Sequence, residues 1–194
     1  METGITLYQK TANDLLMQAT ANGVSVPANE ERLILSADGA TVGQMADREL
    51  GQAVKMLLQG IYHMCGIRAD ITIADEATFF SFLQRWFHSF TLVDVKMAFE
   101  FYVVGELDRY LPKDRNGEPS HKHYQTFSAE FYTPILRAYR KRQQEAKVTV
   151  SSKVAVALLE AAPKPDPKEV RLGCIAIMRE AAVALSEGGE ARYM

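Results

Sequence analysis

The sequence predicts an all-α protein, a compact bundle of five to seven helices. Apolar residues recur with the period of an amphipathic helix over most of the 194-residue chain. Strand patterns are confined to brief pieces such as "DITI" and "KVTV", and no internal repeat is visible. A composition of 47% hydrophobic and 24% charged residues is ordinary for a globular protein. A length of 194 residues is enough for one domain with a small appendage.

The first part of the chain is expected to form short helices. Residues 3–22 are weakly amphipathic, and this pattern stops at Asn22-Gly23. In "PANEERLIL", Pro27 and two acids suit a first helical turn. The stretch "SADGATVGQ" then interrupts the chain. We therefore treat residues 1–44 as an N-terminal helical extension.

A core domain is expected over residues 45–147, and it begins with a strongly amphipathic helix. Asp47 is a suitable N-cap for this helix, and Gly66 is a suitable end. Its apolar residues fall on one helical face. They are Leu50, Val54, Leu57, Leu58, Ile61, Tyr62 and Cys65.

Two further helices follow in the core domain. Residues 75–90 carry aromatic side chains at helical spacing, and Thr91 then starts another helix with Asp94 three positions later, a capping-box pattern. This second helix is apolar on both sides and ends at Gly105, so we expect it to be central. The residues expected in the core are Leu57, Ile61, Phe79, Leu83, Trp86, Phe99 and Tyr102.

The remainder of the chain is expected to alternate between helices and breaks. Helix resumes near Ser128, and Pro134 either kinks this helix or restarts it with Thr133 as N-cap. After Lys147, "VTVSSK" separates it from a further helix, "VAVALLEAA". Three prolines within residues 163–167 predict a semi-rigid linker to a last helix, residues 167–187. Residues 148–194 are thus expected to hold C-terminal helices joined by a proline-rich linker.

The sequence shows no recognisable catalytic machinery. The phosphate-binding loop of nucleotide hydrolases is absent, as are the GxSxG, HExxH and paired CxxC motifs. His121 and His123 lie in a polar loop without a third ligand at zinc-site spacing. We therefore expect a non-enzymatic protein without a metal or a cofactor.

The compartment is expected to be reducing. Cys65 and Cys174 are far apart and lie in apolar helical patterns, which favours free thiols over a disulfide. The N-terminus lacks a basic region followed by an apolar core, so no signal peptide is expected. No run of about 18 apolar residues exists, so no membrane span is expected either. These features predict a cytoplasmic protein.

The most unusual local feature is a group of cations within and after "HYQTFSAEFYTPILRAYRKRQ", residues 123–143. Between Pro134 and Lys153 there are six cations and one acid, Glu145, a local charge of +5 in a chain whose net charge is −2. On a helix, Arg137, Arg140 and Lys141 share one face. The six cations are Arg137, Arg140, Lys141, Arg142, Lys147 and Lys153.

Two interpretations of these cations remain open. Cations near the C-terminal end of a helix complement its dipole and keep the surface soluble. Alternatively, they form a surface that contacts phosphates or an acidic partner. The aromatic side chains of the same segment recur at helical spacing, which favours a place in the core over a base-stacking role.

Two stretches within residues 45–145 carry a family pattern, "TLVDVKMAFEFYVVGELDRYLPKDRNG" and "HKHYQTFSAEFYTPILRAYRKRQ". This part of the chain resembles a poorly characterised family encoded by tailed phages and related mobile elements. The matching positions are Thr91, Asp94, Lys96, Ala98, Phe99, Glu100, Gly105, Glu106, Leu107, His123, Tyr124, Gln125, Phe127, Ser128, Leu136, Ala138 and Tyr139. Members are regarded as replication-associated, similar to helicase loaders or primosome accessory proteins.

The resemblance implies a non-enzymatic replication accessory protein. Without a phosphate-binding loop the chain cannot be a loader driven by ATP, so it would act as an adaptor between DNA and a replicative helicase in the host cytoplasm. The six cations are the expected contact residues. The alternatives are a phage virion or assembly protein that oligomerises through helical surfaces, and a small regulator that binds a host protein.

Overall fold

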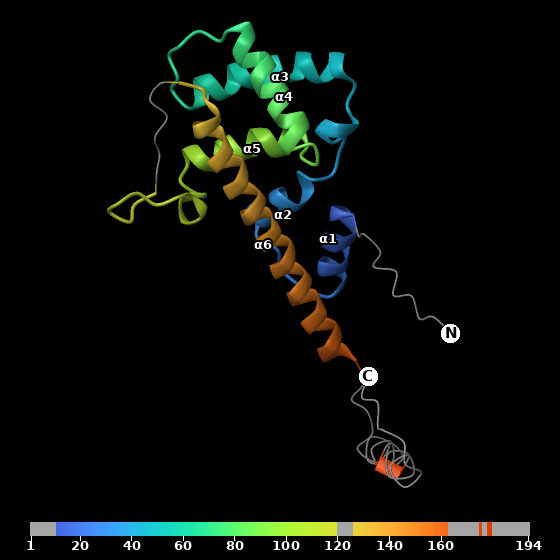
Figure 1. Cartoon of the computed structure of the whole chain (residues 1–194). Helices are drawn as coiled ribbons and strands as arrows, with labels where there is room; N and C mark the ends of the chain where they lie inside the picture. The colour runs from blue at the N-terminus through green and yellow to red at the C-terminus, as the bar shows by residue number, and fades with distance from the viewer. Residues whose placement is uncertain (1–10, 120–125, 163–174, 176–177, 180–194) are drawn as a thin grey trace, which may run out of the picture. The chain divides into compact units, whose positions relative to one another are not determined.

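Helices make up the protein, as the sequence predicts. The computed structural model describes residues 11–119, 126–162, 175, 178 and 179. This part of the chain forms six α-helices, labelled in Figure 1, and two short 3-10 helices. They are α1 (Ala12–Ala21), α2 (Ala28–Leu35), η1 (Val42–Gln44), α3 (Asp47–Met64), α4 (Ile73–Trp86), α5 (Leu92–Val103), η2 (Asp108–Tyr110) and α6 (Ala129–Ala161). Residues 11–119 and 126–162 contain no β-strand, and two isolated bridges join Thr41 to Thr91 and Lys113 to Pro119.

The chain divides into two compact units, Met1–Ala157 and Leu158–Met194. The three-part division expected from the sequence, 1–44, 45–147 and 148–194, stays a prediction. The linker expected at 163–167 lies outside the described residues, and so does nearly all of the expected helix 167–187.

Three helices begin with the same arrangement of Thr and Asp side chains. At α5, the Thr91 hydroxyl accepts from the Asp94 amide at 3.0 Å, and the Asp94 carboxylate accepts from the Thr91 amide at 2.9 Å. Thr72 and Asp75 repeat this capping box at α4, and a third box starts α1. The expected cap of α3 is wrong by one residue, because Ala46 holds the cap position and Asp47 starts the helix. There its carboxylate still complements the positive end of the helix dipole.

Glycine ends two core helices, as predicted. After α5 the chain turns at Gly105, with φ of 78°, and the Glu106 amide donates to the carbonyl of Phe101 at 2.9 Å. After α3 it turns at Gly66, with φ of 67°, and the Ile67 amide donates to Tyr62 at 2.9 Å. Both are Schellman motifs, in which a left-handed residue satisfies the last carbonyls of the helix. Glycine suits this conformation because it has no Cβ.

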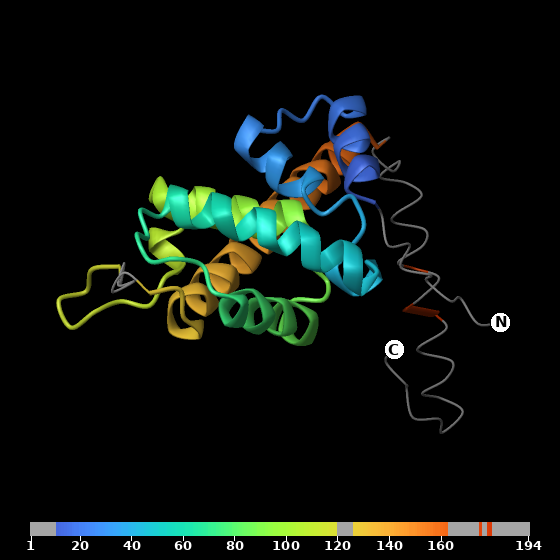
Figure 2. The same cartoon turned by 90° about the horizontal axis from the view of Figure 1, so that it is seen from above.

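Aromatic side chains fill the centre of the core. The Phe127 ring lies 5.0 Å from Phe79, 5.0 Å from Tyr132 and 5.3 Å from Tyr62, measured between centroids. Phe127 therefore joins α3, α4 and α6. Figure 2 shows α3, α4 and α5 beside the first part of α6. A smaller cluster packs α1 and α2 against the later part of α6 and contains Ala12, Ala19, Ile34, Val150 and Val154.

The predicted core is correct except at one position. Ile61, Phe79, Leu83, Phe99 and Tyr102 are buried, and Leu57 is half-buried against them. The prediction for Trp86 is wrong, because its side chain is 57% exposed. Helix α4 ends at Trp86, and the chain turns at Phe87, whose φ is −131°. Phe87 and Phe90, which follow the end of the helix, are buried.

The expected break after Lys147 is wrong. Helix α6 runs without interruption to Ala161, and "KVTV" and "VTVSSK" are helical within it. Val150 and Val154 lie one turn apart and are both buried, so tertiary packing outweighs the β-propensity of this segment. Pro134 lies inside α6, which begins at Ala129, so of the two alternatives expected for this residue the restart at Thr133 is wrong. In "DITI", Ile73 starts α4, so this piece is not a strand either.

Among the residues that the structure describes, no helix combines the length and the apolar character needed to cross a bilayer.

Replacement of Phe99 by Ala is expected to lower the free energy of unfolding by about 3–5 kcal/mol, because the ring is fully buried and leaves a cavity. Urea denaturation followed by circular dichroism measures this loss. Met56→Ala is the matched control, because Met56 lies in α3 with its side chain exposed, and it should change stability by less than about 0.5 kcal/mol. Equal effects of the two variants would contradict the position of Phe99.

Candidate functional site

The six cations of α6 lie on three sides of the helix. A helix has 3.6 residues per turn, so residues 4, 7 or 11 apart come to lie on the same side. Arg137 and Lys141 share one side, which is exposed. Arg140 and Lys147 share a flank, and Arg142 and Lys153 share the opposite flank. Arg137, Arg140 and Lys141, at i, i+3 and i+4, are neighbours on the helix surface, and Arg140 lies at the edge of this group, half-buried against the end of α4.

The salt bridges of the described residues do not include the cations of α6. They join Arg32 and Lys96 to Glu100, Lys55 to Glu76 and Arg109 to Glu145.

Arg140 lies against the end of α4. Its guanidinium carbon is 4.8 Å from the centroid of Phe87 and 4.9 Å from that of Phe90, a double cation–π contact. Its Nη2 donates to the backbone carbonyl of Trp86 at 3.5 Å. Partial burial, followed by repulsion from Arg137, lowers the pKa of Arg140. Arg140 thus contacts the C-terminal end of α4. The dipole interpretation concerned the end of the helix that carries the cations, and α6 has no basic residue in its last turn.

Lys141 lies beside a small polar cluster formed by Arg109, Tyr110 and Glu145. The Tyr110 hydroxyl donates to Glu145 at 2.6 Å, and Arg109 forms an ion pair with the same carboxylate. The Lys141 Nζ is 5.8 Å from the Tyr110 ring centroid. The hydrogen bond from Tyr110, and after it the charges of Arg109 and Lys141, lower the pKa of Glu145. Glu145, the one acid of the basic segment, therefore already has partners.

A buried polar cluster fixes α6 against α2 and α5. The Asp94 Oδ1 accepts from the Ser36 hydroxyl at 2.7 Å, from the Gln143 amide at 2.8 Å and from the Tyr139 hydroxyl at 3.2 Å. Its Oδ2 accepts from the Thr91 amide at 2.9 Å. Asp94 is only 2% exposed. Burial, and after it the Asp94 charge, raises the pKa of Tyr139. This cluster is internal, so we assign it to positioning α6.

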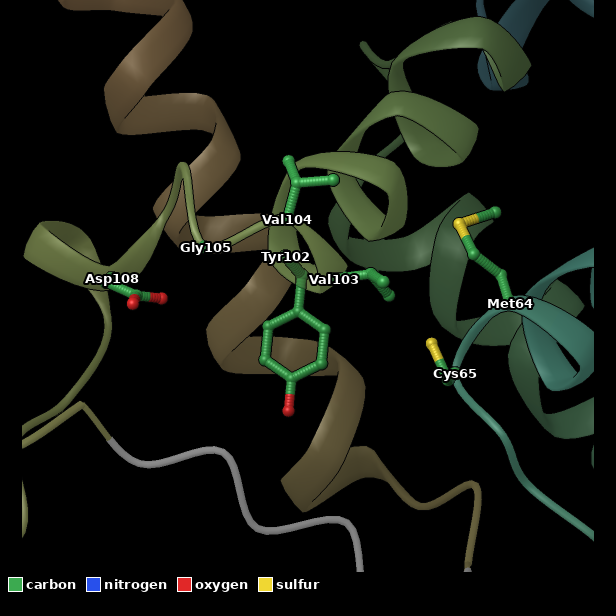
Figure 3. A pocket seen from close by; sticks show the side chains of 7 residues that line it. All are labelled: Met64, Cys65, Tyr102, Val103, Val104, Gly105 and Asp108. Atoms are coloured by element: carbon green, nitrogen blue, oxygen red, sulfur yellow. The ribbon is translucent and has the colours of Figure 1, made fainter.

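A pocket of about 450 Å³ lies where α3 and α5 end. Figure 3 shows the Tyr102 ring between Asp108 on one side and Cys65 with Met64 on the other. Burial raises the pKa of Cys65 to about 11, so the thiol is protonated at neutral pH. Burial, and after it Cys65 and Asp108, raise the pKa of Tyr102 to about 12. The pocket offers a protonated thiol and a protonated phenol, which are poor nucleophiles.

Metal binding has no candidate site in the part of the chain that the structure describes, where no three His, Cys, Asp or Glu side chains come together. The loop histidines His121 and His123 lie outside the described residues.

The end of α4 is a surface feature that the sequence did not predict. Trp86 is exposed there, and the guanidinium carbon of Arg85 lies 5.3 Å from its ring centroid. The position of Arg85 beside the only tryptophan was visible in the sequence. The helical spacing of Trp86 with Phe79 and Leu83, however, pointed to the core. Because α4 ends at Trp86, the indole ring is exposed instead.

Comparison of the chain with protein-family models, with curated proteins and with solved structures finds no match. The relationship to the phage family stays a prediction from the sequence motifs. Three motif residues, Thr91, Asp94 and Tyr139, belong to the buried polar cluster.

The Tyr139 hydroxyl and Asp94 are expected to contribute to the free energy of unfolding in a coupled way, because they share a hydrogen bond. A double-mutant cycle of Tyr139→Phe with Asp94→Ala should give a coupling free energy of about 0.5–3 kcal/mol in urea denaturation. The matched cycle uses Tyr132→Phe, because Tyr132 is equally buried but packs on the rings of Phe79 and Phe82. Coupling near zero is expected there. Equal coupling in both cycles would contradict the hydrogen-bond cluster.

Stability is expected to fall as the pH rises above about 9–10. Cys65 and Tyr102 keep their protons in the folded chain up to pKa values of about 11 and about 12, whereas the ordinary values are 9.0 and 10.0. In the intervening range the unfolded chain binds fewer protons than the folded chain, so alkali favours unfolding. Urea denaturation at several pH values measures the fall. Tyr102→Phe should make it shallower, and a flat profile for the native chain would contradict the burial of these groups.

Proposed function

We propose that this chain is a non-enzymatic accessory protein of phage or mobile-element DNA replication that contacts DNA through α6. The observation that supports this proposal is the positive charge of the helix. Six cations stand between Pro134 and Lys153, the one acid among them is held by Arg109 and Tyr110, and none of the six forms a salt bridge within the described residues.

The exposed side of α6 is the best candidate for phosphate contact. Arg137 and Lys141 lie there one turn apart with exposed side chains, which suits successive phosphates of one strand. Arg140 lies at the edge of the same region, where its guanidinium keeps unused N–H groups while it stacks on two rings. Two or three contacts of this kind predict weak binding, which fits an adaptor that gains affinity from a second partner.

The helicase partner rests on the family resemblance. Mixing the chain with a replicative helicase encoded in the same genome, followed by size-exclusion chromatography, tests this part of the proposal. Co-elution supports an adaptor. Separate elution leaves DNA contact alone as the proposed activity.

DNA binding is expected to weaken steeply with salt, because each neutralised phosphate releases condensed counterions. Two or three contacts predict a slope of about −2 to −3 in a plot of log K against log salt concentration for duplex DNA. Fluorescence anisotropy of a labelled oligonucleotide measures this slope. The double variant Arg137→Glu/Lys141→Glu should lose binding and keep its circular dichroism spectrum, because both side chains are exposed.

A matched control variant changes the net charge by the same amount at two positions outside α6. Arg48 and Arg115 are exposed and lie outside α6, so Arg48→Glu/Arg115→Glu changes the net charge equally. It should keep most of the binding. Equal loss in both variants would indicate a diffuse charge effect. Absence of binding by the native chain at low salt would overturn the proposal and favour the virion or regulator alternatives.

A further inference from the structure

The exposed end of α4 joins the chain's only tryptophan to the basic helix. Trp86 is the last residue of α4 and is 57% exposed, although tryptophan is usually among the most extensively buried residues. Arg85 lies over its ring, and Arg140 reaches its backbone carbonyl from α6. An aromatic face and two guanidinium groups thus come together from two elements.

The charges at this place repel one another in the free protein. Burial, and after it the charge of Arg137, lowers the pKa of Arg140, and neither residue forms a salt bridge among the described residues. Arg85 forms none of these salt bridges either. An anion bound here would relieve this repulsion, so the surroundings of Trp86 favour a negatively charged ligand.

A ligand that stacks a base on Trp86 would account for both the exposed indole and the positive charge around it. A nucleotide carries a flat base and a phosphate in one unit, and single strands expose base faces that a duplex hides between its base pairs. An acidic peptide would use the arginines but has no need of an exposed indole. We infer that Trp86, with Arg85 and Arg140, forms a stacking site for single-stranded nucleic acid. This inference rests on the proposed function and specifies its ligand.

The site has a fixed geometry on the protein side. Arg140 holds the carbonyl of Trp86 and packs on Phe87 and Phe90, which are both buried. The backbone that carries the indole is therefore tied to the core and to α6. A base that stacks on Trp86 would bring its phosphates toward the side of α6 that carries Arg140 and Arg137.

The emission of Trp86 tests the inference directly, because it is the only tryptophan of the chain. Titration with an oligothymidylate of about 12 nucleotides should quench this emission, and the matching duplex should quench it far less. In fluorescence anisotropy, Trp86→Ala should weaken binding of the single strand about 5- to 100-fold. Trp86→Phe should retain most of the affinity, because a flat ring remains. Ile73→Ala is the control, since Ile73 is exposed at the other end of α4.

The possible results separate this inference from the proposed function. If Trp86→Ala binds the single strand as tightly as the native chain, or if only the duplex binds, the stacking site is wrong and DNA contact through α6 stands. If neither form of DNA binds, both proposals fail. If poly-glutamate quenches the emission as strongly as the oligonucleotide does, the site takes an acidic protein, and the inference is overturned.

Discussion

The carboxylate of Asp94 holds three helices together at one buried point. It lies in the first turn of α5, accepts from Ser36 at the end of α2, and accepts from Tyr139 and Gln143 of α6. Placing a carboxylate inside a protein is costly unless hydrogen bonds and positive potential compensate for lost water. Here the donors come from three elements, and the N-terminal end of α5 adds its dipole. The register of α6 against the rest of the core depends on this arrangement.

Because Tyr139 and Gln143 are fixed inward, the directions of the neighbouring side chains of α6 follow from helical geometry. Arg137 and Lys141 are turned to solvent, and Arg140 is brought to the edge that faces α4. The buried cluster and the basic surface are thus two consequences of one helix position. Arg140 links the core to the basic surface, because it stacks on the buried Phe90 ring and also lies beside Arg137.

The cations of α6 differ in their surroundings. Arg140 has a structural role, because it donates to a carbonyl at the end of α4 and packs on Phe87 and Phe90. Arg137 and Lys141 are exposed, and Lys141 lies beside Tyr110 and Glu145; these two residues carry the functional proposal. The exposed Trp86 beside Arg140 extends this surface to α4, so the candidate interface is made by the junction of two helices.

The sequence by itself determined the helical class, the capping box of Thr91 with Asp94, the ends at Gly66 and Gly105, and most of the core. These features depend on local backbone chemistry and on periodicity, which neighbouring residues encode. Only the tertiary structure decided that Trp86 lies outside, that α6 continues past Lys147, and that Arg140 packs against the end of α4. These outcomes depend on where one element ends against another. Phe87 and Phe90, which follow the end of α4, are buried, whereas Trp86 is exposed, and packing of Val150 and Val154 on α1 and α2 keeps α6 helical.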